Sequence, residues 1–363
     1  MAETFALGSL VIPGPYVQVK AEGLIGAPAV STGNVGIVGT AALGTGTTRL
    51  VSTYAEALAA FGSYDEFGED GAALNLVRGL EVLYRNGGGA VFARGLAEGA
   101  NEAAYTAAFN ELIKDDVNIL IAPELTTAQA KNVLGPILEA AENAGHDVMA
   151  VIGSDVDPAA TNALTTIKGQ VPTNDRIVMV TPGVIAFDQV GGADVTLPGT
   201  YSAAAVAGLL STLSVQTSAT NKELPGVGAL AYRFSYAEMT DLINGRLLVL
   251  EQRGGVKVVR ALTTDDGAFK RITTRRIVDY TKAGVRGVSR PFIGKLNNQR
   301  VRAALQGAIS GFLTSMLVDE ALVGFNLSVT ATRDDEIAGR AIVNIILEPV
   351  FELEFIPITL ILE

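Results

Sequence analysis

The chain of 363 residues has no cysteine, no tryptophan and a single histidine. Without cysteine there can be no disulfide, no thiolate nucleophile and no thiolate-bound metal, and the composition suits synthesis in a reducing cytoplasm. The one histidine, His146, lies where a predicted helix leads into a predicted strand. Asp147 and Ser154 are near it only in sequence, and no nucleophile-elbow motif accompanies them. We therefore expect no catalytic residues.

Ligand-binding motifs are missing as well. GTAALGTGTT lacks the Gly-Lys-Ser/Thr ending of a phosphate-binding loop, and VGGADVTLPG does not follow the dinucleotide-binding spacing, so both are interpreted as turns. The acidic runs DEFGED and RDDE do not follow the EF-hand spacing and are interpreted as solvated loops. We expect no cofactor and no metal.

Long apolar runs are also absent. No uninterrupted apolar stretch reaches 18 residues, which argues against membrane insertion. The opening MAETFALGS has neither a basic region nor a long apolar region, so we expect no signal peptide.

The residues that are present favour a large aliphatic core. Hydrophobic residues make up 48% of the chain and aromatic residues only 6%, with 40 glycines, so Ala, Val, Leu and Ile must fill closely packed elements. Between Ala90 and Thr181, four apolar strands alternate with three amphipathic helices. This pattern predicts a parallel sheet covered on both faces, and the chain length suggests two or three domains.

Several helix ends are marked by capping residues. Ser52 or Thr53 can cap a helix in STYAEALAAFG, and Ser235 with Glu238 forms a capping box. Asn297 or Asn298 can start a later helix. Its apolar stripe consists of Val301, Leu305, Ile309, Phe312 and Met316.

The end of the chain alternates strictly. In FELEF, Phe351, Leu353 and Phe355 share one face while Glu352 and Glu354 share the other. Ile358, Leu360 and Leu362 continue the alternation. An apolar strand of this kind needs a sheet to join, either within the chain or on another copy.

Charge is distributed unevenly along the chain. The net charge is −11, yet Arg253 to Arg302 carries thirteen basic residues against three acidic ones. A basic segment in an acidic protein indicates an interaction face, although a solvated face would explain it too. Nucleic acid is not expected as a partner, because aromatic residues for base stacking are sparse in this segment and the acidic remainder would repel phosphate.

Two segments carry a resemblance to a known family. PGPYVQV, near the start, resembles the PGVYV-type opening of contractile tail sheath proteins, except that Pro15 follows Gly14 where a small apolar residue is usual. Tyr232 to Leu362 is similar to their C-terminal domain in the order, spacing and length of its segments, including SYAEMTDLINGRLLVLEQ and RRIVDYTKAGVRGVSRPFIGKLNNQRVRAAL.

The resemblance implies a structural subunit without enzymatic activity, with α/β and α+β parts: a central parallel α/β layer, a C-terminal α+β domain, and extended strand arms at both ends. The implied divisions are an N-terminal arm at 1–20, a Gly/Ala-rich segment at 21–95, an outer α/β domain at 96–225, an inner domain at 226–347 and a C-terminal arm at 348–363. The linker SVQTSATNKELPG places the boundary before the inner domain.

The resemblance also implies the partners and the location of the protein. The subunit would form a helical homopolymer around a tail tube, contact baseplate and tail terminator proteins, and act in the tail of a virion or injection particle. Residues expected to pair between subunits are Tyr16, Val17, Val19, Phe351, Leu353, Phe355, Ile358 and Leu360. Basic residues expected to face the tube are Arg275, Arg276, Lys282, Arg286, Lys295, Arg300 and Arg302.

A second hypothesis stays open at this point. The chain could be an α/β enzyme or ligand-binding protein with a site at the carboxyl ends of the parallel strands, near Pro123, Gly153 and Pro182. In that case the last apolar segment would be an internal strand.

Overall fold

The computed structural model of the chain describes residues 30–63, 75–188 and 191–362. These residues form two compact units. We call residues 30–283 together with residues 349–362 the sheet unit, and residues 284–348 the hairpin unit. The chain passes from the sheet unit into the hairpin unit within helix α8 (Ile272–Ser289) and returns between Glu348 and Pro349.

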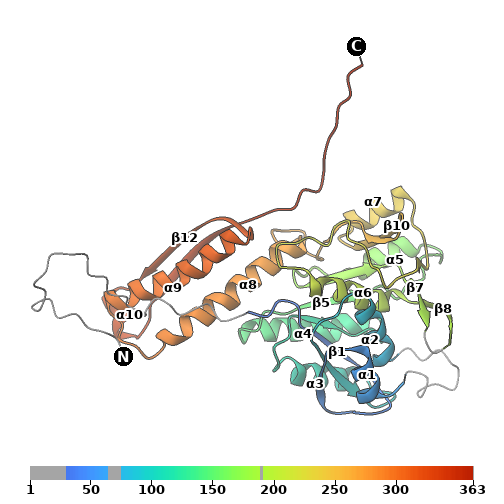
Figure 1. Ribbon diagram of the computed structural model, residues 1–363, viewed down its shortest axis with the longest axis horizontal. Coiled ribbons are helices and arrows are strands. Elements are labelled where there is room, and N and C mark those ends of the chain that lie inside the picture. The colour runs from blue at the N-terminus through green and yellow to red at the C-terminus, as the bar shows by residue number, and fades with distance from the viewer. Residues whose placement is uncertain (1–29, 64–74, 189–190, 363) are drawn as a thin grey trace, which may run out of the picture. The chain divides into compact units, whose positions relative to one another are not determined.

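The sheet unit is built on eight strands in the order β11-β10-β6-β5-β4-β1-β3-β2 (Figure 1). In chain order they are β1 (Val35–Thr40), β2 (Thr48–Val51), β3 (Val91–Leu96), β4 (Ile119–Ile121), β5 (Met149–Gly153), β6 (Ile177–Thr181), β10 (Leu248–Gln252) and β11 (Val256–Val258). The six inner strands are parallel, and the two edge strands, β2 and β11, are antiparallel to their neighbours. The predicted central parallel layer is confirmed.

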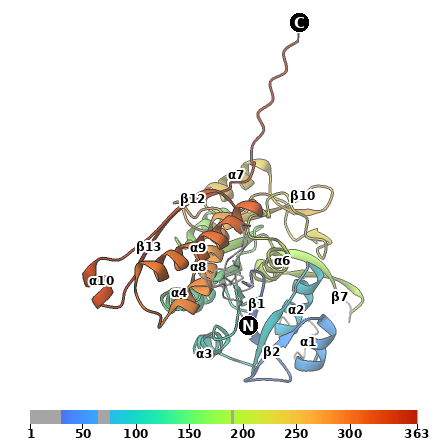
Figure 2. The same cartoon turned by 60° about the vertical axis from the view of Figure 1, so that its left-hand side comes forward.

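Helices cover both faces of this sheet, which explains why its strands are apolar almost throughout. Ile119 and Ile121 of β4 belong to the core on one face, while Leu120 belongs to the core on the other. Figure 1 and Figure 2 show the helices that cover the two faces of the sheet. The first face carries α1 (Tyr54–Phe61), α2 (Leu76–Arg85) and α6 (Gly199–Thr212). The second carries α3 (Glu102–Leu112), α4 (Thr127–Asn143), α5 (Ala163–Gln170) and α7 (Tyr236–Asn244).

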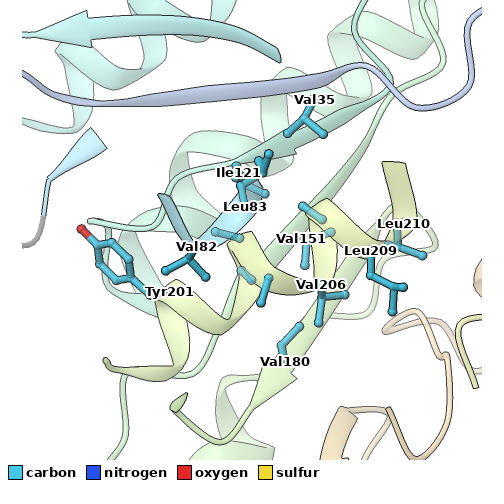
Figure 3. Close-up of a cluster of buried hydrophobic side chains, with 14 of the residues drawn as sticks. Val35, Val82, Leu83, Ile121, Val151, Val180, Tyr201, Val206, Leu209 and Leu210 are labelled. Carbon is cyan, nitrogen blue, oxygen red and sulfur yellow. The ribbon is translucent and has the colours of Figure 1, made fainter. Parts of the chain in front are cut away.

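Helix α6 packs unusually close to its neighbours. Its residues from Gly199 to Leu210 are buried, and Figure 3 shows Val206, Leu209 and Leu210 among the side chains of the sheet and α2. A Cβ atom added at Gly208 would overlap the backbone carbonyl of Leu83 in α2. The small residues of this helix therefore permit a backbone approach that larger side chains would prevent.

The predicted helix starts agree with the structure. Thr53 caps α1, and Ser235 and Glu238 form a reciprocal capping box at the start of α7. Asn298 caps α9 (Gln299–Val318) by accepting a hydrogen bond from the backbone N–H of Val301. Local sequence rules suffice at these positions because each cap involves residues at most three apart.

The sheet continues beyond residue 225, where the sequence places a domain boundary. Strand β10 pairs in parallel with β6, and β11 pairs with β10, so residues 248–258 extend the central sheet. The glycine-rich segment after Pro182 is also more regular than predicted. It forms strands β7 (Val184–Asp188) and β8 (Ala193–Leu197), which join β9 (Ala229–Leu230) in a three-stranded sheet. Sequence separation alone gave no signal for either pairing.

The hairpin unit combines helices with a small sheet. It contains the end of α8, a 3-10 turn at Arg290–Phe292, helix α9, strand β12 (Leu322–Thr330), helix α10 (Arg333–Ile337) and strand β13 (Ile342–Pro349). Helix α9 lies along β12 (Figure 1). It buries Leu305, Ile309, Phe312, Leu313 and Met316, which confirms most of the predicted stripe. The C-terminal α+β part is therefore present.

Of the described helices, only α9 has the length and apolar composition that a membrane span would need. Small residues such as Ala303, Ala304 and Ala308 contribute to that composition. Five of its large apolar residues form one buried stripe and the opposite side is exposed, so α9 is an amphipathic helix, and its composition alone carries no membrane assignment.

One carboxyl group is enclosed at the ends of β1 and β4. Glu124 Oε1 accepts a hydrogen bond of 2.7 Å from the backbone N–H of Thr40, and Oε2 accepts bonds from the hydroxyls of Thr40 (2.7 Å) and Tyr105 (3.2 Å). Desolvation outweighs these bonds and raises the pKa of Glu124 to about 7. The fold therefore favours the protonated carboxyl.

We expect Gly208→Ala to destabilise the sheet unit by about 1–3 kcal/mol, because the new methyl group would displace α6 from α2. Gly169→Ala in α5 is the matched control. No atom lies within 4 Å of its added Cβ, so alanine there should stabilise by roughly 0.5–1 kcal/mol through helix propensity. Urea unfolding of both variants measures the difference. Equal effects at the two sites would contradict the close-packing argument.

Glu124 should make stability depend on pH. Its folded-state pKa of about 7 lies above the ordinary value of 4.5, so its contribution is full below about pH 4.5 and is lost as the pH rises through 7. Relative to Glu124→Gln, the parent chain should lose about 2 kcal/mol between pH 5.5 and pH 8. Denaturant unfolding at the two pH values tests this, with the exposed Glu139→Gln as control. Parallel pH profiles for parent and Glu124→Gln would refute it.

Candidate assembly surfaces

The segment that follows β13 is extended and has no regular secondary structure within the single chain. Phe351, Leu353 and Phe355 are 58%, 79% and 71% exposed, so the predicted apolar face points to solvent. From Ile356 to Leu362 the large apolar side chains are 70% to 97% exposed, and Figure 1 shows this end of the chain extending away from the rest of the sheet unit. Such an apolar surface on an extended backbone, outside any strand of the described residues, is a ready donor for strand pairing.

The acidic face of the same segment is held against the sheet unit. Arg260 donates two hydrogen bonds to the carboxylate of Glu354, from Nε at 2.9 Å and from Nη2 at 2.7 Å. Arg271 Nη2 donates to Glu354 at 3.2 Å, and the hydroxyl of Thr273 donates to Glu352 at 2.9 Å. The bidentate bond to Arg260 lowers the pKa of Glu354, so the pair persists at neutral pH. We call these five residues the clasp.

The apolar residues of the clasp region also contact the arginines. The ring of Phe351 lies 5.0 Å from the guanidinium carbon of Arg271, and the ring of Phe355 lies 5.6 Å from that of Arg260. Each arginine therefore binds a carboxylate and an aromatic ring. The alternation predicted from the sequence is realised, with the acidic side turned inward and the apolar side outward.

In the hairpin unit, β12 and β13 pair with each other, and no other strand of the described residues joins them. Gly324 near the start of β12 lies beside Glu348 near the end of β13, as in an antiparallel pair. Val323 and Ile346 are 69% and 65% exposed. A two-stranded sheet is marginal by itself, so additional strands would complete it.

The predicted N-terminal pairing residues Tyr16, Val17 and Val19 lie outside the described residues. The described chain begins at Val30, directly before β1.

Two of the seven basic residues expected to face a tube have internal roles. Arg275 is 3% exposed and bonds Asp175 at 2.7 Å and Asp279 at 2.6 Å. Arg276 is 5% exposed and donates only to backbone carbonyls. Both guanidinium groups are enclosed and bonded within the chain, so these two residues are the least accessible of those expected to meet a tube. The sequence could not distinguish a buried basic residue from an exposed one.

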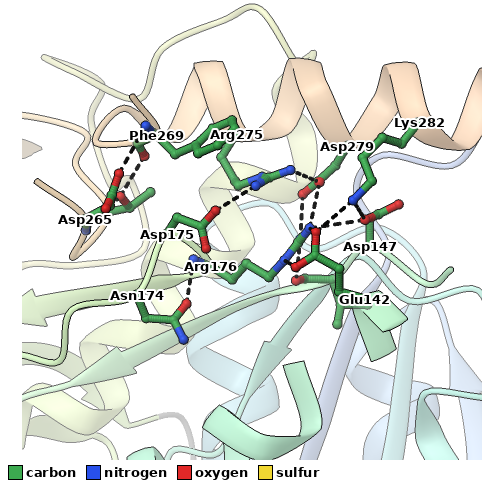
Figure 4. Close-up of polar contacts among 12 residues, drawn as sticks. Glu142, Asp147, Asn174, Asp175, Arg176, Asp265, Phe269, Arg275, Asp279 and Lys282 are labelled. Atoms are coloured by element: carbon green, nitrogen blue, oxygen red, sulfur yellow. Dashed lines mark hydrogen bonds and ion pairs between the residues drawn. The ribbon is translucent and has the colours of Figure 1, made fainter. Parts of the chain in front are cut away.

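Lys282 is partly exposed and belongs to a network of charges at the amino ends of the strands, shown in Figure 4. Its Nζ lies 2.8 Å from Glu142 and 2.5 Å from Asp147. Arg176, which is 2% exposed, binds the same two acids and also Asp279 of α8. These bonds fasten α8 to the sheet, and Arg176 lowers the pKa of Glu142. No sequence pattern marks this network, because its members are far apart in the chain.

The remaining four basic residues lie in the hairpin unit. Arg302 pairs with Glu336 at 2.9 Å and bonds the side-chain oxygen of Asn297 at 3.0 Å. Lys295 is exposed, with its Nζ 4.9 Å from the ring of Phe292. Arg300 is exposed and Arg286 partly exposed. Lys295 and Arg300 thus present the most accessible positive charge among the seven.

The strand ends named by the enzyme hypothesis are filled by other parts of the chain. A Cβ atom at Gly153 would overlap the backbone of Gly199, and the carbonyl of Gly153 accepts a hydrogen bond of 3.0 Å from Thr127. Ser202 donates to the carbonyl of Pro182 at 2.7 Å. Among the described residues there is no cluster of three potential metal ligands. The chain is therefore packed closely against Gly153 and Pro182.

Comparisons with known proteins agree on one family. The family model described as phage tail sheath protein central domain matches residues 98–264, and that described as phage tail sheath C-terminal domain matches residues 264–363. A search of curated proteins found no match.

Solved structures show the same fold. The chain is similar to a protein of the anti-feeding prophage baseplate, with a TM-score of 0.75, 18% identity, and coverage of 98% of this chain and 99% of the other. For a contracted sheath complex of the extracellular contractile injection system PVC, the values are 0.72, 18%, 97% and 97%. For a sheath tail protein of Desulfitobacterium hafniense they are 0.64, 14%, 93% and 100%. The two family models together extend from residue 98 to the end of the sequence, so the chain belongs to the phage tail sheath protein family and is a structural sheath protein rather than an enzyme.

Proposed function

We propose that this chain is the repeating subunit of a contractile sheath that polymerises helically around a rigid tail tube and contracts to drive the tube through a target envelope. The observation that carries the proposal is the exposed apolar segment after Phe355. The small β12–β13 sheet, which has only two strands among the described residues, supports it as a place where such a segment could add a strand. Two of the similar structures are sheaths in a contracted state, which supports the mechanical part of the proposal.

In this assembly the C-terminal arm of one subunit adds a strand to the β12–β13 sheet of another copy. Main-chain hydrogen bonds would supply affinity, and Phe351, Leu353, Phe355, Ile358 and Leu360 would supply the apolar face. Tyr16, Val17 and Val19 are proposed to pair in the same way from the N-terminal arm. The resulting strand exchange links every subunit to its neighbours while the units themselves move as nearly rigid bodies.

The tube is proposed to be acidic where it meets the sheath. Lys295 and Arg300 are the principal contacts, with Arg286, Arg302 and Lys282 contributing to the local positive field. Further partners are baseplate and tail terminator proteins at the two ends of the sheath. The protein would be made in the bacterial cytoplasm and would act in the tail of a virion or injection particle, without binding nucleic acid or inserting into a membrane.

Deletion of residues 356–363 should abolish polymerisation and leave the fold intact. The deletion removes exposed apolar residues and keeps the clasp, so the melting temperature should change by no more than a few degrees. Negative-stain electron microscopy of parent and variant reports cylinder formation, and calorimetry reports stability. Leu43→Ser with Leu50→Ser, which removes exposed apolar side chains elsewhere, is the control and should still polymerise.

The opposite pattern would contradict this proposal. If the truncated chain polymerised normally, the segment would not be the donor. If it unfolded, the segment would be an internal strand, as the enzyme hypothesis holds.

Lys295→Glu with Arg300→Glu should weaken tube decoration at low salt, because electrostatic attraction between exposed groups is strongest there. The effect should shrink as salt is added. Cosedimentation of the subunit with purified tail tubes across a salt series measures it. Arg253→Glu with Lys270→Glu makes the same change of charge at exposed positions of the sheet unit and should have little effect. Equal loss in both double variants would mean that overall charge, and no defined face, governs decoration.

A further inference from the structure

The N-terminal and C-terminal arms leave the sheet unit at residues 31–34 and 352–354, which we call the arm roots. One short stretch of chain at the start of α8 contacts both roots. At the C-terminal side, Arg271 and Thr273 hold Glu354 and Glu352. Arg271 also lies beneath the ring of Phe351. All of these contacts come from the residues that start α8 or directly precede it.

At the N-terminal side, Arg276 reaches the chain just before β1. Its Nη2 donates to the carbonyls of Thr32 at 3.1 Å and Leu213 at 2.8 Å, and its Nη1 donates to Ser214 at 3.3 Å. Leu213 is the C-cap of α6, so the guanidinium also interacts favourably with the negative end of that helix. Burial without a carboxylate lowers the pKa of Arg276 to about 10, and the group stays charged at neutral pH.

Other contacts fix the same N-terminal stretch. Ser31 donates to the side-chain oxygen of Asn118 at 2.9 Å, and the backbone N–H of Asn34 donates to the same oxygen at 3.1 Å. Gly33 lies directly against the carbonyl of Ser211, where any side chain would overlap it. Residues 31–34 are therefore as firmly held as residues 352–354.

Helix α8 is itself fixed to the sheet. Arg275 bonds Asp175, and Asp279 receives both Arg275 and Arg176. Removing one member of such a buried group leaves an unpaired charge, which is strongly destabilising. The stretch that binds both arm roots is thus anchored to the core by charges that cannot easily separate.

We propose that the segment from Arg271 to Arg276, with Arg260, is a junction that fastens both arm roots at a fixed separation. This inference rests on the proposed function, in which the arms link neighbouring subunits. Mechanical force applied to one arm is then transmitted to the other arm through the first turns of α8. It does not pass through the strand pairs of the sheet. The arginines act as positioning residues, since they set where each arm begins and do not themselves contact another subunit.

The pattern of contacts distinguishes a junction from ordinary surface ion pairs. Exposed pairs usually contribute little, but the carboxylate of Glu354 is 5% exposed and is bound by two arginines. Glu352 and Glu354 contact the rest of the chain. The alternating apolar side chains of Phe351, Leu353 and Phe355 are mostly exposed. This arrangement fixes the root of the arm and leaves its apolar face available.

The absence of cysteine allows a direct test by spin labelling. Val30→Cys and Leu353→Cys place one nitroxide at each root, and pulsed electron paramagnetic resonance measures the distance between them within one chain. We expect one narrow distance distribution in the unassembled protein. The same distribution should persist in cylinders assembled from labelled chain diluted with an excess of unlabelled chain, in both the extended and the contracted state.

Charge reversal identifies the clasp as the cause. Arg260→Glu with Arg271→Glu should widen the distribution about twofold or more, because the root then behaves as a flexible tether. Adding Glu352→Arg and Glu354→Arg should restore the narrow distribution by exchanging the two charges. Lys257→Glu with Lys270→Glu changes charge equally in the same region and should leave the distribution unaltered.

The N-terminal root is tested with Arg276→Lys, and with Arg276→Met as a second variant in case the first retains the bonds. A folded variant whose label at position 30 becomes mobile supports the junction. A narrow distribution in both Arg276 variants, or no restoration by the exchanged charges, would overturn it. Failure of every chain to form cylinders would refute the proposed function instead, and the distances in the unassembled protein would still decide the junction.

Discussion

The pairing of buried charges between α8 and the sheet is the interaction on which the rest of this structure depends. Arg176 at the start of β6 binds Glu142, Asp147 and Asp279, and through Asp279 it fixes the helix that leads into the hairpin unit. Desolvation raises the pKa of Asp279, and the neighbouring arginines oppose that effect. Such a group stabilises only as a complete set, since each charge satisfies another. The helix that joins the two units is for this reason an integral part of the sheet unit over its first three turns.

A subunit that donates strands faces a conflict between folding and assembly. Its arms must be apolar enough to pair with a neighbour, yet an apolar arm can collapse onto its own chain. The C-terminal segment resolves the conflict by alternation. Hydrogen bonds to Glu352 and Glu354 hold the root of the arm in place within the single chain. The side chains of Phe351, Leu353 and Phe355 stay mostly exposed to solvent. The same segment is therefore held to its own chain on one face and has an exposed apolar surface on the other.

The sequence predicted those features that depend on short-range periodicity. The parallel layer, the α9 stripe and the caps at Thr53, Ser235 and Asn298 all follow from residues within a few positions of each other. Features that depend on distant contacts were not accessible. From the sequence, Arg276 is predicted to belong to a basic surface, whereas it donates hydrogen bonds to the distant residues Thr32 and Leu213. Likewise, the sequence assigns β10 to a separate domain, whereas β10 pairs with β6 of the central sheet. Glu124 was missed because its environment comes from Thr40 and Tyr105, on separate elements.

The location of the weak and strong contacts bears on how such a subunit could change its assembly without unfolding. Within the sheet unit, the parallel strands are satisfied on both edges and both faces, so rearranging them would break many hydrogen bonds at once. In contrast, residues 356–362 have exposed side chains and can move about the clasp at little cost. A transition between two lattices would therefore concentrate its backbone changes in the few residues just beyond Phe355, while Arg260 and Arg271 keep the point of attachment constant. Rigid units joined by short flexible segments with fixed origins can change their packing and still remain connected, which is the mechanical requirement for a sheath that shortens as one body.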